Sequence, residues 1–127
     1  MSNLNTHAEP KFIHDKQVIV NILREIGVPR SVLGFTYIQD IIVSVTDGGK
    51  RNRFELQNLY YNVSQMYNVT PASIERAIRY AIGVSWKYNS SVIIQDLYRY
   101  CTDGRPAHNK EFITAVADEY LSRMTNK

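Results

Sequence analysis

Apolar residues recur at helical spacing along most of this 127-residue chain, and polar or turn-forming residues separate the apolar stretches. The pattern predicts helices over residues 13–26, 34–45, 59–67, 71–86, 91–100 and 110–124. Residues 34–45 are rich in β-branched and aromatic side chains, which favour a strand, but Ile38, Ile41 and Ile42 follow helical spacing. We therefore expect an all-α fold of about six helices in one compact domain over residues 12–127, after a flexible N-terminal arm over residues 1–11.

The helices predicted over residues 59–67 and 71–86 are separated by only three residues, as in a helix-turn-helix unit. Asn68 tolerates left-handed backbone geometry, Thr70 supplies an N-cap oxygen, and Pro71 fits the first helical position, where no backbone N–H is needed. The apolar residues of the first helix are expected to share one buried face: Leu59, Tyr60, Val63, Met66 and Tyr67. The predicted buried stripe of the second helix comprises Ile74, Ala77, Ile78, Ala81 and Ile82.

The polar face of the second helix carries side chains that suit the reading of DNA bases. Arg76 and Arg79 lie one turn apart, and arginine matches the paired acceptors of guanine in the major groove. Glu75 can accept a hydrogen bond from the cytosine amino group. Glu75 and Arg79 also have the i, i+4 spacing of a surface ion pair, which contributes only about 0.3–0.5 kcal/mol. Both interpretations stay open.

Residues 46–53, TDGGKRNR, are predicted to form a loop because Asp47, Gly48 and Gly49 are turn formers. This loop is also the densest group of cations in the chain, with Lys50, Arg51 and Arg53. A loop that precedes the first helix of a helix-turn-helix can lie along the DNA backbone and contact phosphates. A solvated surface loop is the equal alternative.

Composition limits the function only loosely. The net charge of +3 permits DNA binding without indicating it. A single cysteine, Cys101, excludes an internal disulfide and fits a reducing compartment. The sequence contains neither a signal peptide nor a long apolar run, so we expect a cytoplasmic protein that does not associate with a membrane.

The chain lacks the residue patterns of an enzyme. Its three histidines, His7, His14 and His108, are far apart, and no His/Cys/Asp/Glu cluster has the spacing of metal ligands. Gly48–Gly49 is surrounded by neither a P-loop nor a GxGxxG motif. We therefore expect no catalysis, no cofactor and no metal.

Several separated blocks occur in one order along the chain: REIGVPRSVLGFTYIQDIIVSV, LYYNVSQMYNVT, SIERAIRYAIGVSW and EFITAVADEYL. Together they resemble the DNA-binding effector domain of the master sporulation response regulators (stage zero sporulation protein A) over about residues 18–121. The resemblance implies an all-α helix-turn-helix domain without catalytic activity. It also implies a regulator that reads a short box resembling TGTCGAA in double-stranded DNA.

The resemblance can be carried over residue by residue. Glu75, Arg76 and Arg79 match the family's glutamate and two arginines. Ser73 stands where the family typically has an arginine, and Tyr80 where it typically has a histidine, so we expect an altered or relaxed sequence preference. Thr70 and Tyr61 join Lys50, Arg51 and Arg53 as predicted contacts to the DNA backbone.

Family regulators carry an N-terminal receiver domain, and this sequence starts with about ten loose residues instead. We therefore expect regulation through abundance, self-association or another protein. Family effector domains bind as tandem dimers on adjacent boxes and contact RNA polymerase sigma factor near the position of Leu97–Tyr98. The alternative function is a receiver-less protein-interaction module, such as an antagonist of a full-length regulator or of sigma factor.

Overall fold

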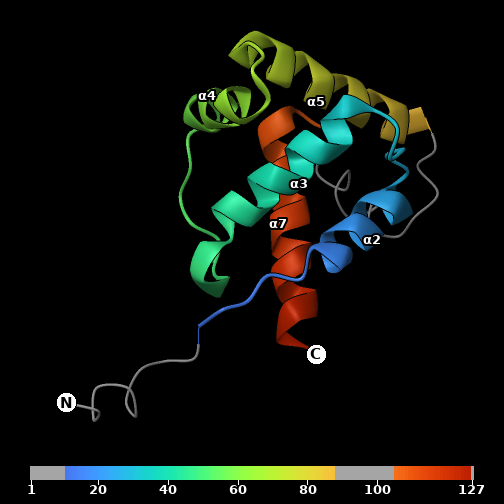
Figure 1. Cartoon of the computed structure of the whole chain (residues 1–127). Helices are drawn as coiled ribbons and strands as arrows, with labels where there is room; N and C mark the ends of the chain where they lie inside the picture. The colour runs from blue at the N-terminus through green and yellow to red at the C-terminus, as the bar shows by residue number, and fades with distance from the viewer. Residues whose placement is uncertain (1–10, 88–104, 127) are drawn as a thin grey trace.

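The computed structural model describes residues 11–87 and 105–126, which form five α-helices and one 3-10 turn (Figure 1). The elements are α2 (Lys16–Ile26), α3 (Leu33–Val45), η1 (Asp47–Gly49), α4 (Leu56–Tyr67), α5 (Pro71–Lys87) and α7 (Asn109–Thr125). The described residues contain no strand, which confirms the all-α prediction. Residues 1–10 of the predicted arm and the helix predicted over residues 91–100 lie outside the described part of the chain.

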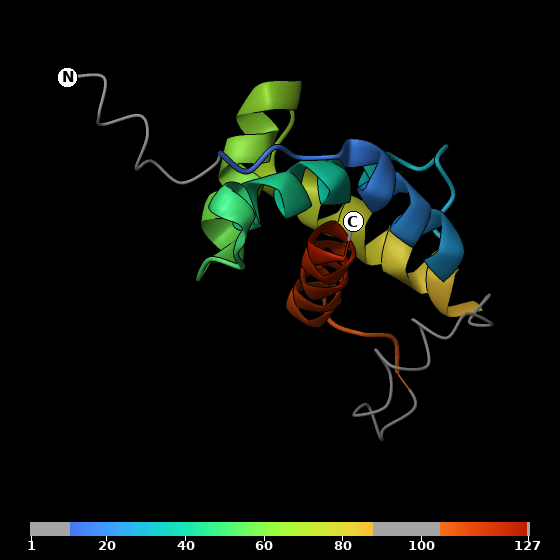
Figure 2. The same cartoon turned by 90° about the horizontal axis from the view of Figure 1, so that it is seen from below.

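Helix α3 is the centre of the fold, because it contacts α2, α4, α5 and α7. Figure 2, which looks nearly along α7, shows α3 lying between α4 and α2. The side chains of Ile38, Ile41 and Ile42 are completely buried on one face of α3. Burial of these helically spaced residues outweighs the β-propensity of the stretch. The prediction of a helix here is confirmed.

A glycine sets the approach of α3 to α5. Gly34 lies in the first turn of α3, and a Cβ atom built on it would come within 2.3 Å of the Ala77 carbonyl oxygen and 2.8 Å of the Ala81 Cβ. No side chain fits between the two backbones at this point. The crossing therefore depends on the absence of a Cβ at residue 34.

The turn between α4 and α5 has the predicted geometry. Asn68 ends α4 in the left-handed conformation with φ 55°, and Pro71 is the first residue of α5. The Thr70 hydroxyl accepts a hydrogen bond from the Ser73 amide at 3.1 Å, which is an N-cap interaction. The predicted buried face of α4 is wrong at its end, because Met66 is 65% exposed and Tyr67 is 39% exposed.

Tyr67 is held at the rim of the core and not inside it. Its ring makes an edge contact with Tyr37, with 5.1 Å between the centroids, and its hydroxyl donates to the carboxylate of Asp40. This hydrogen bond raises the pKa of the Tyr67 hydroxyl to about 12. A tyrosine at this position keeps its polar end at the surface, which is why the apolar spacing overstated its burial.

The predicted start of the first helix is also wrong. Residues 13–15 are not helical, and α2 begins at Lys16 because the Asp15 carboxylate caps the helix by accepting from the Gln17 amide at 3.1 Å. Residues 11–15, here called the strap, pack against α7. The hydroxyl of buried Tyr120 accepts from the Asp15 amide at 3.0 Å and lies 2.9 Å from Nδ1 of His14.

The turn predicted in the loop over residues 46–53 is present as η1, in which Gly48 and Gly49 have positive φ angles. Two further helix starts differ from the predictions. Helix α4 begins at Leu56 and not at residue 59, and the last helix begins at Asn109 and not at Lys110, with His108 as its N-cap. Glu111 completes a capping box by accepting from the His108 amide at 2.7 Å. No described helix is long and apolar enough to cross a membrane.

We predict that Gly34→Ala lowers the free energy of unfolding by about 1–3 kcal/mol, because the new methyl group meets a backbone oxygen that cannot move aside cheaply. Urea unfolding followed by circular dichroism measures the change. Gly83→Ala in α5 is the matched control. A Cβ on Gly83 meets nothing within 4 Å, and alanine is favoured in a helix by roughly 0.8–1 kcal/mol, so this variant should be more stable than the wild type. Equal changes in the free energy of unfolding for Gly34→Ala and Gly83→Ala would contradict the close contact of Gly34 with α5.

The His14 ring predicts a pH dependence of stability. Burial lowers its pKa, which Asp47 partly offsets and Lys16 reinforces. Because the folded state favours the neutral ring, its contribution to stability is complete above the ordinary histidine pKa of about 6.5 and decreases as the pH falls below it. Urea unfolding at about pH 8 and about pH 5 should show a smaller decrease for His14→Gln than for the wild type. An unchanged decrease in the variant would exclude His14 as its source.

Candidate nucleic-acid interface

Helix α5 turns a cationic face away from the core. Arg76, Arg79 and Tyr80 are exposed on it, whereas Ile74 and Ile78 on the opposite face are completely buried. Arg76 forms no ion pair with any residue in the described ranges 11–87 and 105–126. The structure thus brings the two predicted base-reading arginines onto one accessible surface.

Arg79 already has a partner on its own helix. Its Nη1 atom lies 2.8 Å from Oε2 of Glu75, and the two side chains are 63% and 32% exposed. The i, i+4 ion pair considered from the sequence is therefore present. An exposed pair of this kind contributes about 0.3–0.5 kcal/mol, so a nucleobase that accepts from Arg79 can displace Glu75 at small cost.

The first turn of α5 holds the other predicted polar contacts. The hydroxyls of Thr70 and Ser73 lie 2.9 Å apart, and the Thr70 hydroxyl also accepts from the Ser73 amide. Ser73 is half-buried, and Thr70 is exposed at the N-terminus of the helix. Both hydroxyls thus organise the helix start, where unpaired amides and the helix dipole favour an anion.

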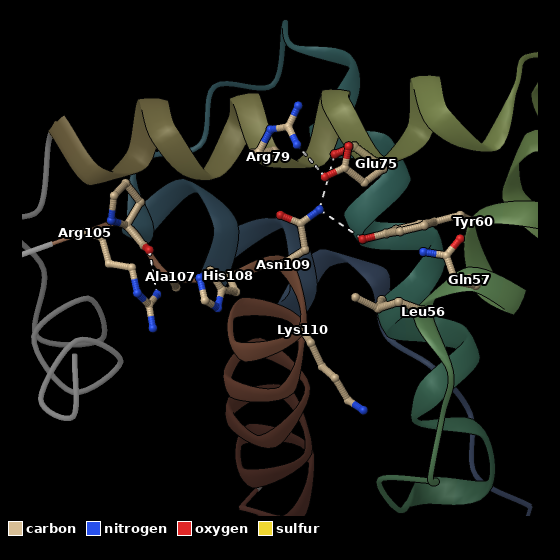
Figure 3. Close-up of a pocket in the computed structure, with 11 residues that line it drawn as sticks. Leu56, Gln57, Tyr60, Glu75, Arg79, Arg105, Ala107, His108, Asn109 and Lys110 are labelled. Atoms are coloured by element: carbon tan, nitrogen blue, oxygen red, sulfur yellow. Dashed lines mark hydrogen bonds and ion pairs between the residues drawn. The ribbon is translucent and has the colours of Figure 1, made fainter. Parts of the chain in front are cut away.

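Asn109, for which the local sequence predicts no contact with another helix, holds α5 in place. The Nδ2 atom of Asn109 donates to the Tyr60 hydroxyl at 3.0 Å and to the Glu75 carbonyl oxygen at 3.2 Å, so the first residue of α7 joins α4 to α5 (Figure 3). Burial raises the pKa of the Tyr60 hydroxyl, and the bond from Asn109 partly offsets this. An asparagine before an amphipathic helix suggests a cap; nothing in the local sequence shows a partner 49 residues away.

These residues border a cleft of about 600 Å³ between α4, α5 and residues 105–110 (Figure 3). Two cations at its rim are already neutralised: Arg79 by Glu75 at 2.8 Å, and Arg105 by Glu111 at 3.0 Å. The hydrogen bond from Arg105 lowers the pKa of the Glu111 carboxyl group. Two of the cations that line the cleft are thus paired within the domain, and a third, Lys110, lies over the Phe54 ring.

The structure does not bring the cationic loop beside α5. Lys50, Arg51 and Arg53 are exposed after the C-terminal end of α3, at the opposite end of that helix from its crossing with α5 (Figure 1). The Nε atom of Arg51 lies 2.6 Å from Oδ1 of Asp118 in α7, which ties the loop to that helix. Tyr61 is 57% exposed on α4.

Within the described residues, no group of three or more His, Cys, Asp or Glu side chains is placed to hold a metal ion.

The capped α4–turn–α5 unit, with a buried apolar stripe and two outward arginines, defines a helix-turn-helix domain. The family described as Sporulation initiation factor Spo0A C terminal matches residues 19–120. The chain belongs to this family of DNA-binding transcription effector domains, which are not enzymes. The residues implicated in sigma-factor contact by the resemblance, Leu97–Tyr98, lie outside the described part of the chain.

We predict that Asn109→Ala lowers the free energy of unfolding by about 1–3 kcal/mol, because buried Tyr60 and the Glu75 carbonyl oxygen both lose a donor. Urea unfolding measures the loss. Asn58→Ala is the matched control, since Asn58 is exposed on α4 and its side chain forms no hydrogen bond with another described residue. If the two alanine variants were equally stable, the bridge between α4, α5 and α7 would contribute nothing to the fold.

Proposed function

We propose that this domain is a sequence-specific regulator of transcription that inserts α5 into the major groove of duplex DNA. The observation that carries the proposal is the pair Arg76 and Arg79, exposed one turn apart on the outward face of a capped helix. Family membership supports DNA as the partner. A DNA partner supports a location inside the cell, and we propose the cytoplasm.

Base reading is assigned to Glu75, Arg76 and Arg79, with Ser73 and Tyr80 beside them. Arg76 binds paired acceptors of guanine directly, and Arg79 does so by exchanging Glu75 for a base. The freed Glu75 carboxylate then accepts from a cytosine amino group. Since Ser73 cannot make the bidentate guanine contact of the family's arginine, the sequence preference differs from that of a box read by three arginines.

Backbone contacts are assigned to residues in two places. Thr70 and Tyr61 lie on the helix-turn-helix itself, where hydroxyl groups hydrogen-bond to phosphate oxygens. The loop cations Lys50, Arg51 and Arg53 remain part of the proposal as phosphate contacts. Because they lie at the far end of α3, they meet only a duplex that continues past α5 along that side of the domain.

Two finer proposals follow from the family. Two copies of the domain bind adjacent boxes in tandem, and the promoter-bound domain contacts RNA polymerase sigma factor. The tandem arrangement predicts a measured stoichiometry of two domains bound to each duplex that carries two adjacent boxes.

A second candidate function is a module that binds another protein. Helix α4 and the turn after it expose large apolar side chains: Tyr61, Met66, Tyr67 and Val69. The salt dependence of the binding affinity distinguishes the two functions. Phosphate neutralisation makes log affinity fall with log salt at a slope of about −0.9 per phosphate contacted, whereas an apolar protein interface responds weakly.

The proposed function predicts that Arg76→Ala and Arg79→Ala each weaken binding to the preferred duplex by roughly 5- to 150-fold, the equivalent of one bidentate base contact. Fluorescence anisotropy with tandem TGTCGAA-like boxes and a scrambled duplex, at two salt concentrations, measures the loss. Arg24→Ala in α2 removes the same charge from a helix that does not carry the reading face, and its affinity should change by less than about twofold.

The outcomes are distinct. If the wild type binds the boxes more tightly than the scrambled duplex and both arginine variants lose this preference, the result supports base reading by α5. Equal affinity for the box and scrambled duplexes indicates a moved sequence preference, and Ser73→Arg should then restore discrimination. An absence of binding to either duplex at low salt overturns the DNA-binding proposal in favour of the protein-binding module.

A further inference from the structure

A second cleft opens beside the reading face of α5, and its volume is about 350 Å³. It lies between the start of α3 and the middle of α5, and its lining is mainly apolar: Val32, Leu33, Gly34, Arg76, Ala77 and Tyr80. Arg76 and Tyr80 belong both to this cleft and to the face proposed to meet DNA. The cleft is therefore continuous with that interface.

Leu33 is a large apolar side chain that stands exposed at one edge of this cleft. It is the first residue of α3 and is 69% exposed, although the next residue, Gly34, is buried against α5. Tyr80, on the opposite wall, is 64% exposed. Two large apolar side chains thus flank an open apolar cleft next to an arginine, and exposed apolar surface rimmed by a polar group is typical of an interaction site.

We propose that this cleft is an apolar specificity subsite, in which Leu33 and Tyr80 receive the 5-methyl group of a thymine next to the base that Arg76 reads. The inference rests on the proposed function and names a base contact from outside the recognition helix. The thymine methyl is the apolar group that a base pair presents in the major groove, and apolar side chains are its partners.

Geometry supports a base contact over a contact to the backbone alone. Arg76 lies at the middle of the exposed stripe of α5, opposite buried Ile74 and Ile78, and Tyr80 follows it by one turn on the α3 side. The Gly34 crossing brings the start of α3 against Ala77, so Leu33 stands beside that same turn of α5. A helix lying in the groove through Arg76 thus brings Leu33 toward the groove edge, where thymine methyl groups project.

Deoxyuridine tests the inference, because it differs from thymidine only by the methyl group. The experiment measures the affinity of the full chain by fluorescence anisotropy for a duplex that it binds. The same duplex is then prepared with every thymine replaced by deoxyuridine, and next with single replacements. For the wild type we expect one or two replacements to weaken binding by about fourfold each, the equivalent of one buried methyl group.

Variants assign the effect to the cleft. Leu33→Ala should bind the thymine and deoxyuridine duplexes with equal affinity at the responsive position, and Leu33→Met should retain the discrimination. Because Leu33 is mostly exposed, neither change removes a core contact. Ile13→Ala is the matched control, since Ile13 is a 78% exposed aliphatic residue of the strap, and its discrimination should equal that of the wild type.

Three results overturn the inference: no deoxyuridine effect at any position, an effect that persists in Leu33→Ala, or a loss in Leu33→Ala that is equal for both duplexes. The last result assigns the cleft to the sugar–phosphate backbone. Failure of the proposed function is distinguishable, because it appears as an absence of binding to the unmodified duplex, and the subsite then fails with it.

Discussion

The close crossing of α3 and α5 at Gly34 is the constraint on which the rest of the structure depends. With no side chain at this position, the backbone of α3 rests on the Ala77 carbonyl and the Ala81 methyl group. The central helix therefore supports the recognition helix directly along its buried stripe. The same contact determines what lies at the surface, since it leaves Leu33 and Tyr80 standing on either side of a cleft. One missing Cβ atom thus sets both the packing of the core and the outline of the proposed reading surface.

Other contacts fix α5 in the orientation that the proposed function requires. The Thr70 cap defines where the helix begins, and Asn109 holds the Glu75 carbonyl from the side of α7. The proposed reading face is therefore already formed in the free domain, and the proposed contacts require no rearrangement of the α5 backbone. The one local change that the proposal requires is the release of Arg79 from Glu75, which separates a weak exposed ion pair. The proposed specificity then depends on side chains that a rigid scaffold holds in place.

The sequence predicted the fold where the physical signal is local. Helical spacing identified residues 34–45 despite their β-propensity, and Asn68 with its neighbours marked the turn before α5. The failures concern partners distant in the chain. His14 meets Tyr120 across 106 residues, and Asn109 bonds to two other helices, so neither role is visible in local spacing. Tyr67 was placed in the core because a helical period assigns a direction and not a depth. The exposure of Arg76 and Arg79 on one face of α5 was predictable, because it depends on spacing within one helix. Their role in base reading stays a prediction.

The strap and α5 contact opposite ends of α7. Asn109 meets α5 at the first residue of α7, whereas the strap meets α7 at Tyr120, eleven residues later and about 16 Å farther along the helix axis. The strap thus lies at the end of the molecule remote from α5 (Figure 1). A fluorophore or a surface linker attached to the strap at exposed Lys11 would therefore sit away from α5, so the domain can be labelled or immobilised there with α5 facing solution.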